Sequence, residues 1–70
     1  MKLRVIVNGV SFYTNSSRIK NRTVGDDSNL NEALYQLFSN MFNAIGMATT
    51  ITLYDSKMKK HSFDIQLSKV

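Results

Sequence analysis

The chain contains no cysteine and no proline, and it has one histidine, His61, and three glycines in 70 residues. Without cysteine there is neither a disulfide nor a thiolate ligand for a metal. A structural zinc would need carboxylates around a single imidazole, so we expect no metal site and no cofactor. A core is small at this chain length, and self-association is the remaining way to bury more surface. These absences favour a homodimer.

Long apolar runs are also missing. No stretch approaches the roughly 20 apolar residues of a membrane-spanning helix. The apolar run near the N-terminus is brief and is interrupted at Asn8–Gly9, unlike a signal peptide. We therefore expect no membrane partner and a cytoplasmic location, with which the absence of cysteine agrees. No repeat, linker or low-complexity tract divides the sequence, so residues 1–70 are predicted to form a single domain.

The usual catalytic sets are absent too. No Ser/His/Asp or Cys/His combination has a usable spacing, and the glycines at 9, 25 and 46 are isolated, unlike a phosphate-binding loop. His61 is the one candidate base near neutral pH, and its predicted position on the core side, near the sheet edge, favours a structural role. Asp26–Asp27 precedes a helix, where capping explains the pair. The sequence therefore predicts no enzyme activity.

The first strongly patterned segment predicts a β-hairpin. Residues 3–7 and 10–14 are rich in β-formers and flank Asn8–Gly9, a pair typical of the type I′ turn because both turn residues need positive φ. The turn sets the register and places Arg4 opposite Tyr13. Alternation then defines a core face and a half-polar face. The core face comprises Leu3, Val5, Val7, Val10 and Phe12, and the other comprises Lys2, Arg4, Ile6, Ser11 and Tyr13.

Residues 15–27 show no clear period. Arg18, Lys20 and Arg22 occupy alternating positions, which favours an extension of the second strand through about Arg22. The alternative is a long functional loop, which is uncommon in a compact domain.

An apolar period of 3.6 residues predicts an amphipathic helix from about Leu30 to Ile45. Asn29 with Glu32 resembles a capping box at its start, and Gly46 suits the position just after its end. The apolar face comprises Leu30, Ala33, Leu34, Leu37, Phe38, Met41, Phe42 and Ile45. The opposite face is polar and nearly uncharged, with Asn31, Gln36, Ser39, Asn40 and Asn43.

The C-terminal part predicts a second hairpin, because residues 49–54 are β-branched and residues 60–67 alternate. Ile51 can share a face with Phe63 only if the loop between the strands has an odd number of residues, three or five, centred near Lys57. With a loop of three residues, Tyr54 lies opposite Lys60 and Leu53 lies opposite His61. The predicted α+β fold is ββαββ, with one amphipathic helix packed on one face of a four-stranded antiparallel sheet and the other face open.

Charge and aromatic residues suggest what the open face does. The formal net charge is +4, which favours phosphate-bearing or acidic partners. Basic side chains among aromatic rings can neutralise phosphates and stack bases. The same residues could instead protect sheet edges or keep a small domain soluble. The candidate binding residues are Lys2, Arg4, Tyr13, Arg18, Lys20, Arg22, Tyr54, Lys57, Lys59 and Lys60.

We therefore expect a small non-enzymatic binding or regulatory protein that engages nucleic acid or an acidic protein surface. Two alternatives are a protein–protein inhibitor or adaptor that occupies a host protein, and a dimeric sponge for an anionic nucleotide. The RNA-recognition motif also has an open basic and aromatic sheet, but this chain lacks that family's Gly-aromatic run and second helix. In size, charge and lack of an active site, the chain resembles small inhibitor or sponge proteins encoded by bacteriophages, without residue correspondence.

Overall fold

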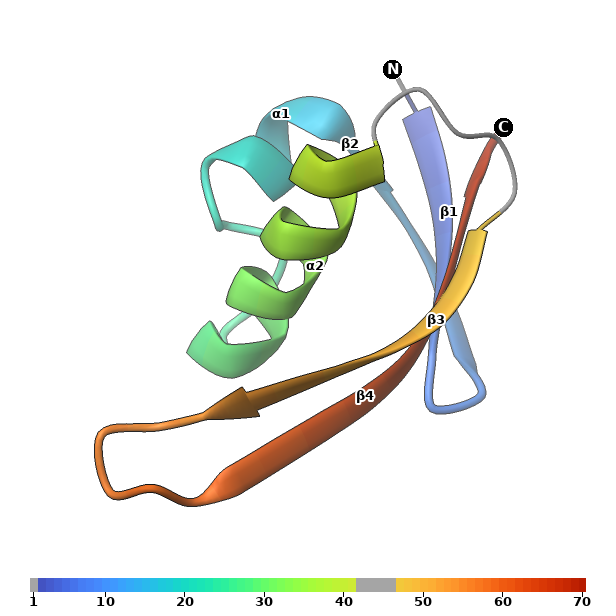
Figure 1. Cartoon of the computed structure of the whole chain (residues 1–70). Coiled ribbons are helices and arrows are strands. Elements are labelled where there is room, and N and C mark those ends of the chain that lie inside the picture. Colours follow the sequence, from blue (N-terminus) through green and yellow to red (C-terminus); the bar gives the residue numbers. More distant parts are fainter. Residues whose placement is uncertain (1, 42–46) are drawn as a thin grey trace.

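The computed structural model describes residues 2–41 and 47–70 (Figure 1). Along the chain lie β1 (Lys2–Val7), β2 (Val10–Asn15), α1 (Ser16–Lys20), α2 (Ser28–Met41), β3 (Met47–Tyr54) and β4 (Lys60–Lys69). The strands form one antiparallel sheet in the order β2-β1-β4-β3, and both helices lie on one side of it (Figure 1). The predicted α+β fold is confirmed, with the short helix α1 as an addition. Neither described helix combines the length and apolar character needed to cross a membrane.

The β1–β2 hairpin has the predicted turn and register. Asn8 and Gly9 have φ of 49° and 85°, as a type I′ turn requires, and Arg4 pairs with Tyr13. Asn8 also bonds to the neighbouring strand β4. Its backbone N–H donates to the carbonyl of Asp64 at 2.9 Å, and its Oδ1 accepts from the backbone N–H of Asp64 at 2.9 Å. One turn residue thus closes the hairpin and attaches it to β4.

The β3–β4 hairpin also has the predicted register. Tyr54 pairs with Lys60 and Leu53 with His61, and residues 55–59 form the connection. The parity argument from Ile51 and Phe63 was therefore sufficient to align two strands separated by a loop without a glycine.

The segment after β2 is helical, so the predicted strand extension through Arg22 is wrong. Asn15 caps α1, because its Oδ1 accepts the backbone N–H of Arg18 at 2.8 Å. Arg22 adopts a left-handed φ of 58° just after the helix. The backbone N–H groups of Arg22 and Thr23 donate to the carbonyls of Ile19 at 3.1 Å and Arg18 at 2.9 Å, the pattern of a Schellman motif. Burial of Ile19 anchors this single turn of helix. The alternating cations Arg18, Lys20 and Arg22 had led to the prediction of a strand here.

Helix α2 begins at Ser28, two residues earlier than predicted. Its cap is Asp27, whose Oδ1 accepts the backbone N–H groups of Asn29 at 2.9 Å and Leu30 at 3.2 Å. The predicted capping box of Asn29 with Glu32 is wrong, because a carboxylate already occupies that role. The predicted helical positions 42–45 and the glycine at 46 lie outside the described residues.

The core lies between the sheet and the two helices. Its buried side chains are Leu3, Val5, Val7, Ile19, Ala33, Leu34, Leu37, Phe38, Ile65 and Leu67. Two predicted positions differ. Val10 is 67 % exposed, because it begins β2 at the hairpin end that the helices do not cover (Figure 1). Asn31, assigned to the polar helix face, is only 7 % exposed, because the segment between α1 and α2 folds over it.

Candidate functional site

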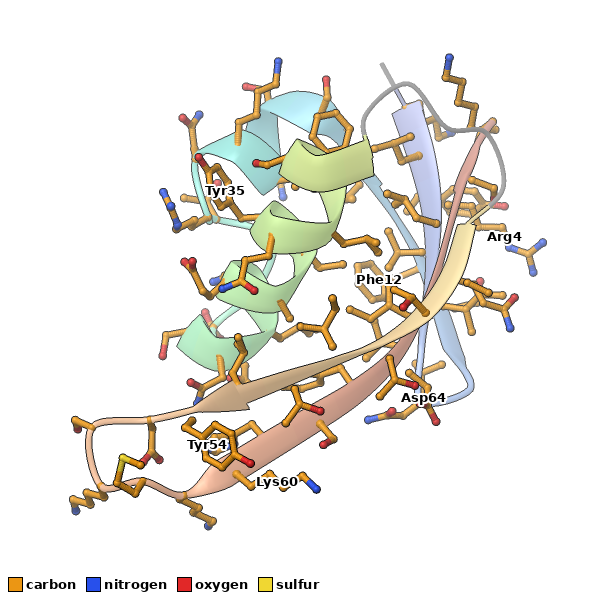
Figure 2. The ribbon with its side chains drawn as sticks, in the orientation of Figure 1. Arg4, Phe12, Tyr35, Tyr54, Lys60 and Asp64 are labelled. Carbon is orange, nitrogen blue, oxygen red and sulfur yellow. The ribbon has the colours of Figure 1, made fainter. Side chains whose placement is uncertain are left out.

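The sheet face opposite the helices carries few charges along most of its length. Alternation along the four strands places uncharged side chains across its middle, and Asp64 is the one acidic residue that the described strands contribute to it. Lys2 and Arg4 lie at one end of this face and Lys60 at the other, as the separation of Arg4 from Lys60 in Figure 2 shows. The open face is therefore not one continuous basic surface.

Strand order separates the two tyrosines of the predicted surface. Tyr13 lies on the edge strand β2 and Tyr54 on the opposite edge strand β3. Tyr13 pairs with Arg4 near the start of β1, whereas Tyr54 pairs with Lys60 next to the β3–β4 turn. The candidate residues consequently fall into three groups, which lie at the chain ends, on the helix side and at the β3–β4 turn.

The first group, which we call the basic end, lies where β1 starts and where β2 and β4 finish. The register sets Lys2 beside Asn15 and Leu3 beside Lys69, and α1 follows directly from β2 (Figure 1). The basic end comprises the cations Lys2, Arg4, Arg18 and Lys69 together with Tyr13. None of these four cations forms a salt bridge within 4.0 Å among the described residues, so their charge is available to a ligand.

A shallow hollow lies at the junction of β2 and α1 within the basic end. It is lined by Lys2, Tyr13, Thr14, Asn15 and Arg18. The ammonium of Lys2 lies 4.9 Å from the centroid of the Tyr13 ring, in cation–π range, and Tyr13 is 60 % exposed. Thr14 Oγ1 is buried without a hydrogen-bond partner among the described residues. Two cations and an accessible ring thus meet at one depression.

Arg4 extends the basic end onto the open sheet face. Its Nε donates to Ser11 Oγ on β2 at 3.2 Å, which orients the side chain along the surface. The side chain points away from the helices (Figure 2). The terminal guanidinium nitrogens have no partner among the described residues, and a planar group of this kind is suited to bidentate phosphate contacts.

The second group lies on the helix side, where α1 and the following turn pack against α2. The ammonium of Lys20 lies 5.8 Å from the centroid of the Phe38 ring. Arg22 Nε donates to Glu32 Oε2 at 2.7 Å, and this bond raises the pKa of Arg22. The structure therefore places Arg22 in an ion pair with Glu32 on the helix side of the sheet, whereas Arg4 and Tyr13 lie on the open face.

The third group surrounds the β3–β4 turn and consists of Tyr54, Lys57, Lys59 and Lys60. These side chains are exposed, and Tyr54 and Lys60 lie side by side in Figure 2. The turn also contains an acidic residue, Asp55, whose Oδ1 accepts the backbone N–H groups of Lys57 and Lys59 at 2.9 Å each. The positive charge of this group is thus partly offset within the turn itself.

His61 lies between the β3–β4 turn and the start of α2. Its Nε2 lies 3.0 Å from Asp55 Oδ2 and 3.5 Å from Asn29 Nδ2. Because an ionised carboxylate can only accept, Nε2 must carry the hydrogen that points to Asp55. The bond from His61, followed by the backbone N–H of Lys59, lowers the pKa of Asp55. His61 lies on the core side, as predicted, and the absence of enzyme activity stays a prediction.

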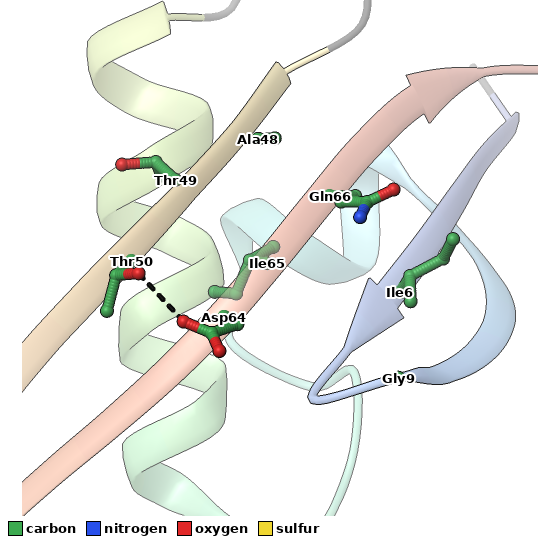
Figure 3. Close-up of a pocket in the computed structure, with 8 residues that line it drawn as sticks. All are labelled: Ile6, Gly9, Ala48, Thr49, Thr50, Asp64, Ile65 and Gln66. Carbon is green, nitrogen blue, oxygen red and sulfur yellow. Dashed lines mark hydrogen bonds between the residues drawn. The ribbon is translucent and has the colours of Figure 1, made fainter.

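A second depression lies in the middle of the open face, between the β1–β2 turn and β3 (Figure 3). Its lining consists of Ile6, Gly9, Ala48, Thr49, Thr50, Asp64, Ile65 and Gln66. Thr50 Oγ1 donates to Asp64 Oδ1 at 2.7 Å across its floor (Figure 3). A carboxylate at this position disfavours anionic ligands, so the basic end is the better anion site.

Lys69 is a member of the basic end that sequence reasoning missed. Nothing local distinguishes this residue, because its position beside Leu3 depends on the pairing of β4 with β1. No family model, curated protein or solved structure matches the chain.

Proposed function

We propose that this chain is a small non-enzymatic binding protein whose basic end engages a nucleic acid. One observation carries the proposal: Lys2 and Arg18 line one hollow with the exposed ring of Tyr13, Arg4 pairs with Tyr13 across the strands, and none of these three cations has a carboxylate partner among the described residues. Lys2, Arg4 and Arg18 would contact phosphates, and Tyr13 would stack on a base. Cations placed around an aromatic side chain supply the two interactions that single-stranded nucleic acids offer, namely phosphate neutralisation and base stacking.

Single strands are the preferred form in this proposal. An exposed ring can stack only on a base that is not already paired and stacked in a duplex. The open face next to Arg4 carries uncharged side chains such as Ser11 and Ser68, which tolerate a strand without demanding a sequence. We therefore expect weak sequence preference and a strong dependence on salt.

The biological setting follows from the same reading. A protein without catalysis acts by occupancy, in the manner of the small bacteriophage accessory or inhibitor proteins that the chain resembles in size and charge. A cytoplasmic location would give it access to nucleic acid. An acidic protein surface is the competing partner, since the same cations would attract it, and the experiment below separates the two.

The test is fluorescence anisotropy with a labelled 20-nucleotide single strand, the matching duplex and polyglutamate, between 50 and 500 mM salt. With three phosphates contacted, the slope of log K against log salt should be about −2 for the single strand. The triple variant Lys2→Gln, Arg4→Gln, Arg18→Gln should lose most affinity. The matched triple Lys57→Gln, Lys59→Gln, Lys60→Gln removes the same charge from the β3–β4 turn and should retain most of it.

Three results would overturn the proposal. One is no binding of the single strand at 50 mM salt. A second is an equal loss of affinity in both triple variants, which would mean that only net charge matters. The third is tighter binding of polyglutamate than of the single strand, which would indicate an acidic protein partner.

A further inference from the structure

Strand β3 forms one edge of the sheet and has an unusual composition for that position. It is eight residues long (Met47–Tyr54), with the sequence MATTITLY, and contains neither a charged residue nor a proline. Edge strands of monomeric proteins are commonly protected from pairing by lysine, proline or a bulge. Its one hydrogen-bonded neighbour among the described strands is β4. Its outward backbone groups are therefore suited to pairing with another strand.

The charge distribution indicates that the strand best suited to pair with β3 is the β3 strand of a second copy of the chain. A molecule with net charge +4 repels its own copy wherever cations meet, and a two-fold axis sets the residues that lie next to it close to their own equivalents. Antiparallel pairing of two β3 strands, centred on Ile51, would place Ile51 beside its copy, Thr49 beside Leu53 and Thr50 beside Thr52. Every one of these pairs is uncharged, and the β-branched pairs are favourable cross-strand neighbours.

Apolar side chains at the same edge are incompletely buried, which supports contact with a second copy of β3. Ile51 and Leu53 face the helix side, but each remains only partly buried against the core, as does Phe63 on β4. A copy of β3 would cover the outer flanks of the first two. The other edge is less suitable, because β2 is shorter, with six residues, and leads directly into α1.

We propose that the chain forms a two-fold symmetric dimer through antiparallel pairing of its β3 strands, which joins two four-stranded sheets into one continuous sheet. This inference does not depend on nucleic-acid binding, since it uses a different edge and different residues from the basic end.

The test is sedimentation velocity of the full chain from 5 to 500 µM at 300 mM salt, where repulsion between the basic surfaces is screened. The wild type should pass from the monomer mass to twice that mass. Thr52→Lys places like charges near each other across the two-fold axis and, compared with the wild type at 100 mM salt where these charges are less screened, should weaken dimerisation about twofold to fivefold. The matched control Ser11→Lys adds the same charge to the same sheet face on the opposite edge strand, β2, and should dimerise like the wild type.

Hydrogen exchange on the wild type gives a second measurement that does not depend on a variant folding. Amides of β3 should become more protected at high protein concentration, whereas those of β2 should not change. The proposal is overturned by a monomer over the whole concentration range, by an unaltered dimer in Thr52→Lys, by equal weakening in Ser11→Lys, or by concentration-dependent protection confined to β2.

Discussion

The guanidinium carbon of Arg22 lies 3.7 Å from the centroid of the Tyr35 ring on α2. The Nε of Arg22 donates to Glu32, which lies one turn before Tyr35 on α2. Arg22 itself occupies the left-handed position that ends α1, where glycine is usual because it lacks a Cβ. The stacking and the ion pair offset this unfavourable backbone conformation. A single side chain thereby attaches the end of α1 to α2.

Replacement of Arg22 should separate these two effects. Arg22→Ala removes the stacking and the ion pair but keeps a Cβ at positive φ, so the melting temperature should fall. Arg22→Gly removes the same contacts and relieves the backbone strain, so its melting temperature should lie between those of Arg22→Ala and the wild type. Thermal unfolding followed by circular dichroism measures both. A wild-type melting temperature for Arg22→Ala would show that the contact with α2 contributes nothing.

Asn31 should be essential for the segment between α1 and α2. Its Oδ1 accepts the backbone N–H of Gly25 at 3.0 Å, and its Nδ2 donates to the Gly25 carbonyl at 2.8 Å. Asn31→Leu leaves both backbone groups without their partners and should lower the free energy of unfolding by about 1–3 kcal/mol. Urea denaturation provides the measurement. Ser39→Ala, on the exposed side of α2, is the control and should stay within about 0.5 kcal/mol of the wild type; equal losses in the two variants would contradict the role of Asn31.

Helix α1 should behave as part of the core although it is only five residues long. Ile19 is fully buried at 0 % exposure, so Ile19→Ala should cost about 2–5 kcal/mol through the cavity that it leaves. Val10→Ala should cost less than about 0.5 kcal/mol, because that side chain is exposed. Denaturant unfolding of both variants checks the pair. A larger loss at Val10 than at Ile19 would restore the assignment made from the sequence and contradict the observed helix.

Acid should weaken the β3–β4 turn through Asp55. The pKa of this carboxyl is lowered in the folded chain, first by the bond from His61 and then by the backbone N–H of Lys59. A carboxyl with a lowered pKa stabilises the fold above its unfolded pKa of about 3.9, and this contribution is lost as the pH falls through the lower folded value.

Asp55→Asn isolates this effect. The difference in free energy of unfolding between the wild type and the variant should shrink as the pH falls below about 4. Urea titrations at a series of pH values measure it. Parallel pH profiles for the two proteins would show that ionisation of Asp55 does not contribute to stability.

Local signals in the sequence determined the strands, both hairpin registers and the main helix. Positive φ at Asn8 and Gly9 selects one turn type, and the parity of Ile51 and Phe63 allows few loop lengths, so neighbouring residues contain the necessary geometry. The same locality explains two errors. The capping oxygen of Asn15 and the single apolar residue Ile19 were weaker signals than three alternating cations, and Asn29 competed with Asp27 as the cap of α2.

Tertiary structure alone decided how the candidate site is divided. The order β2-β1-β4-β3 places Tyr13 and Tyr54 on opposite edges, brings Lys69 to the end that holds Lys2, and leaves β3 at an edge. It also buries Asn31 under a segment that carries no apolar period. These outcomes depend on which distant strands pair and on which loop covers which helix position, and such long-range contacts leave no periodic pattern in the residues that make them.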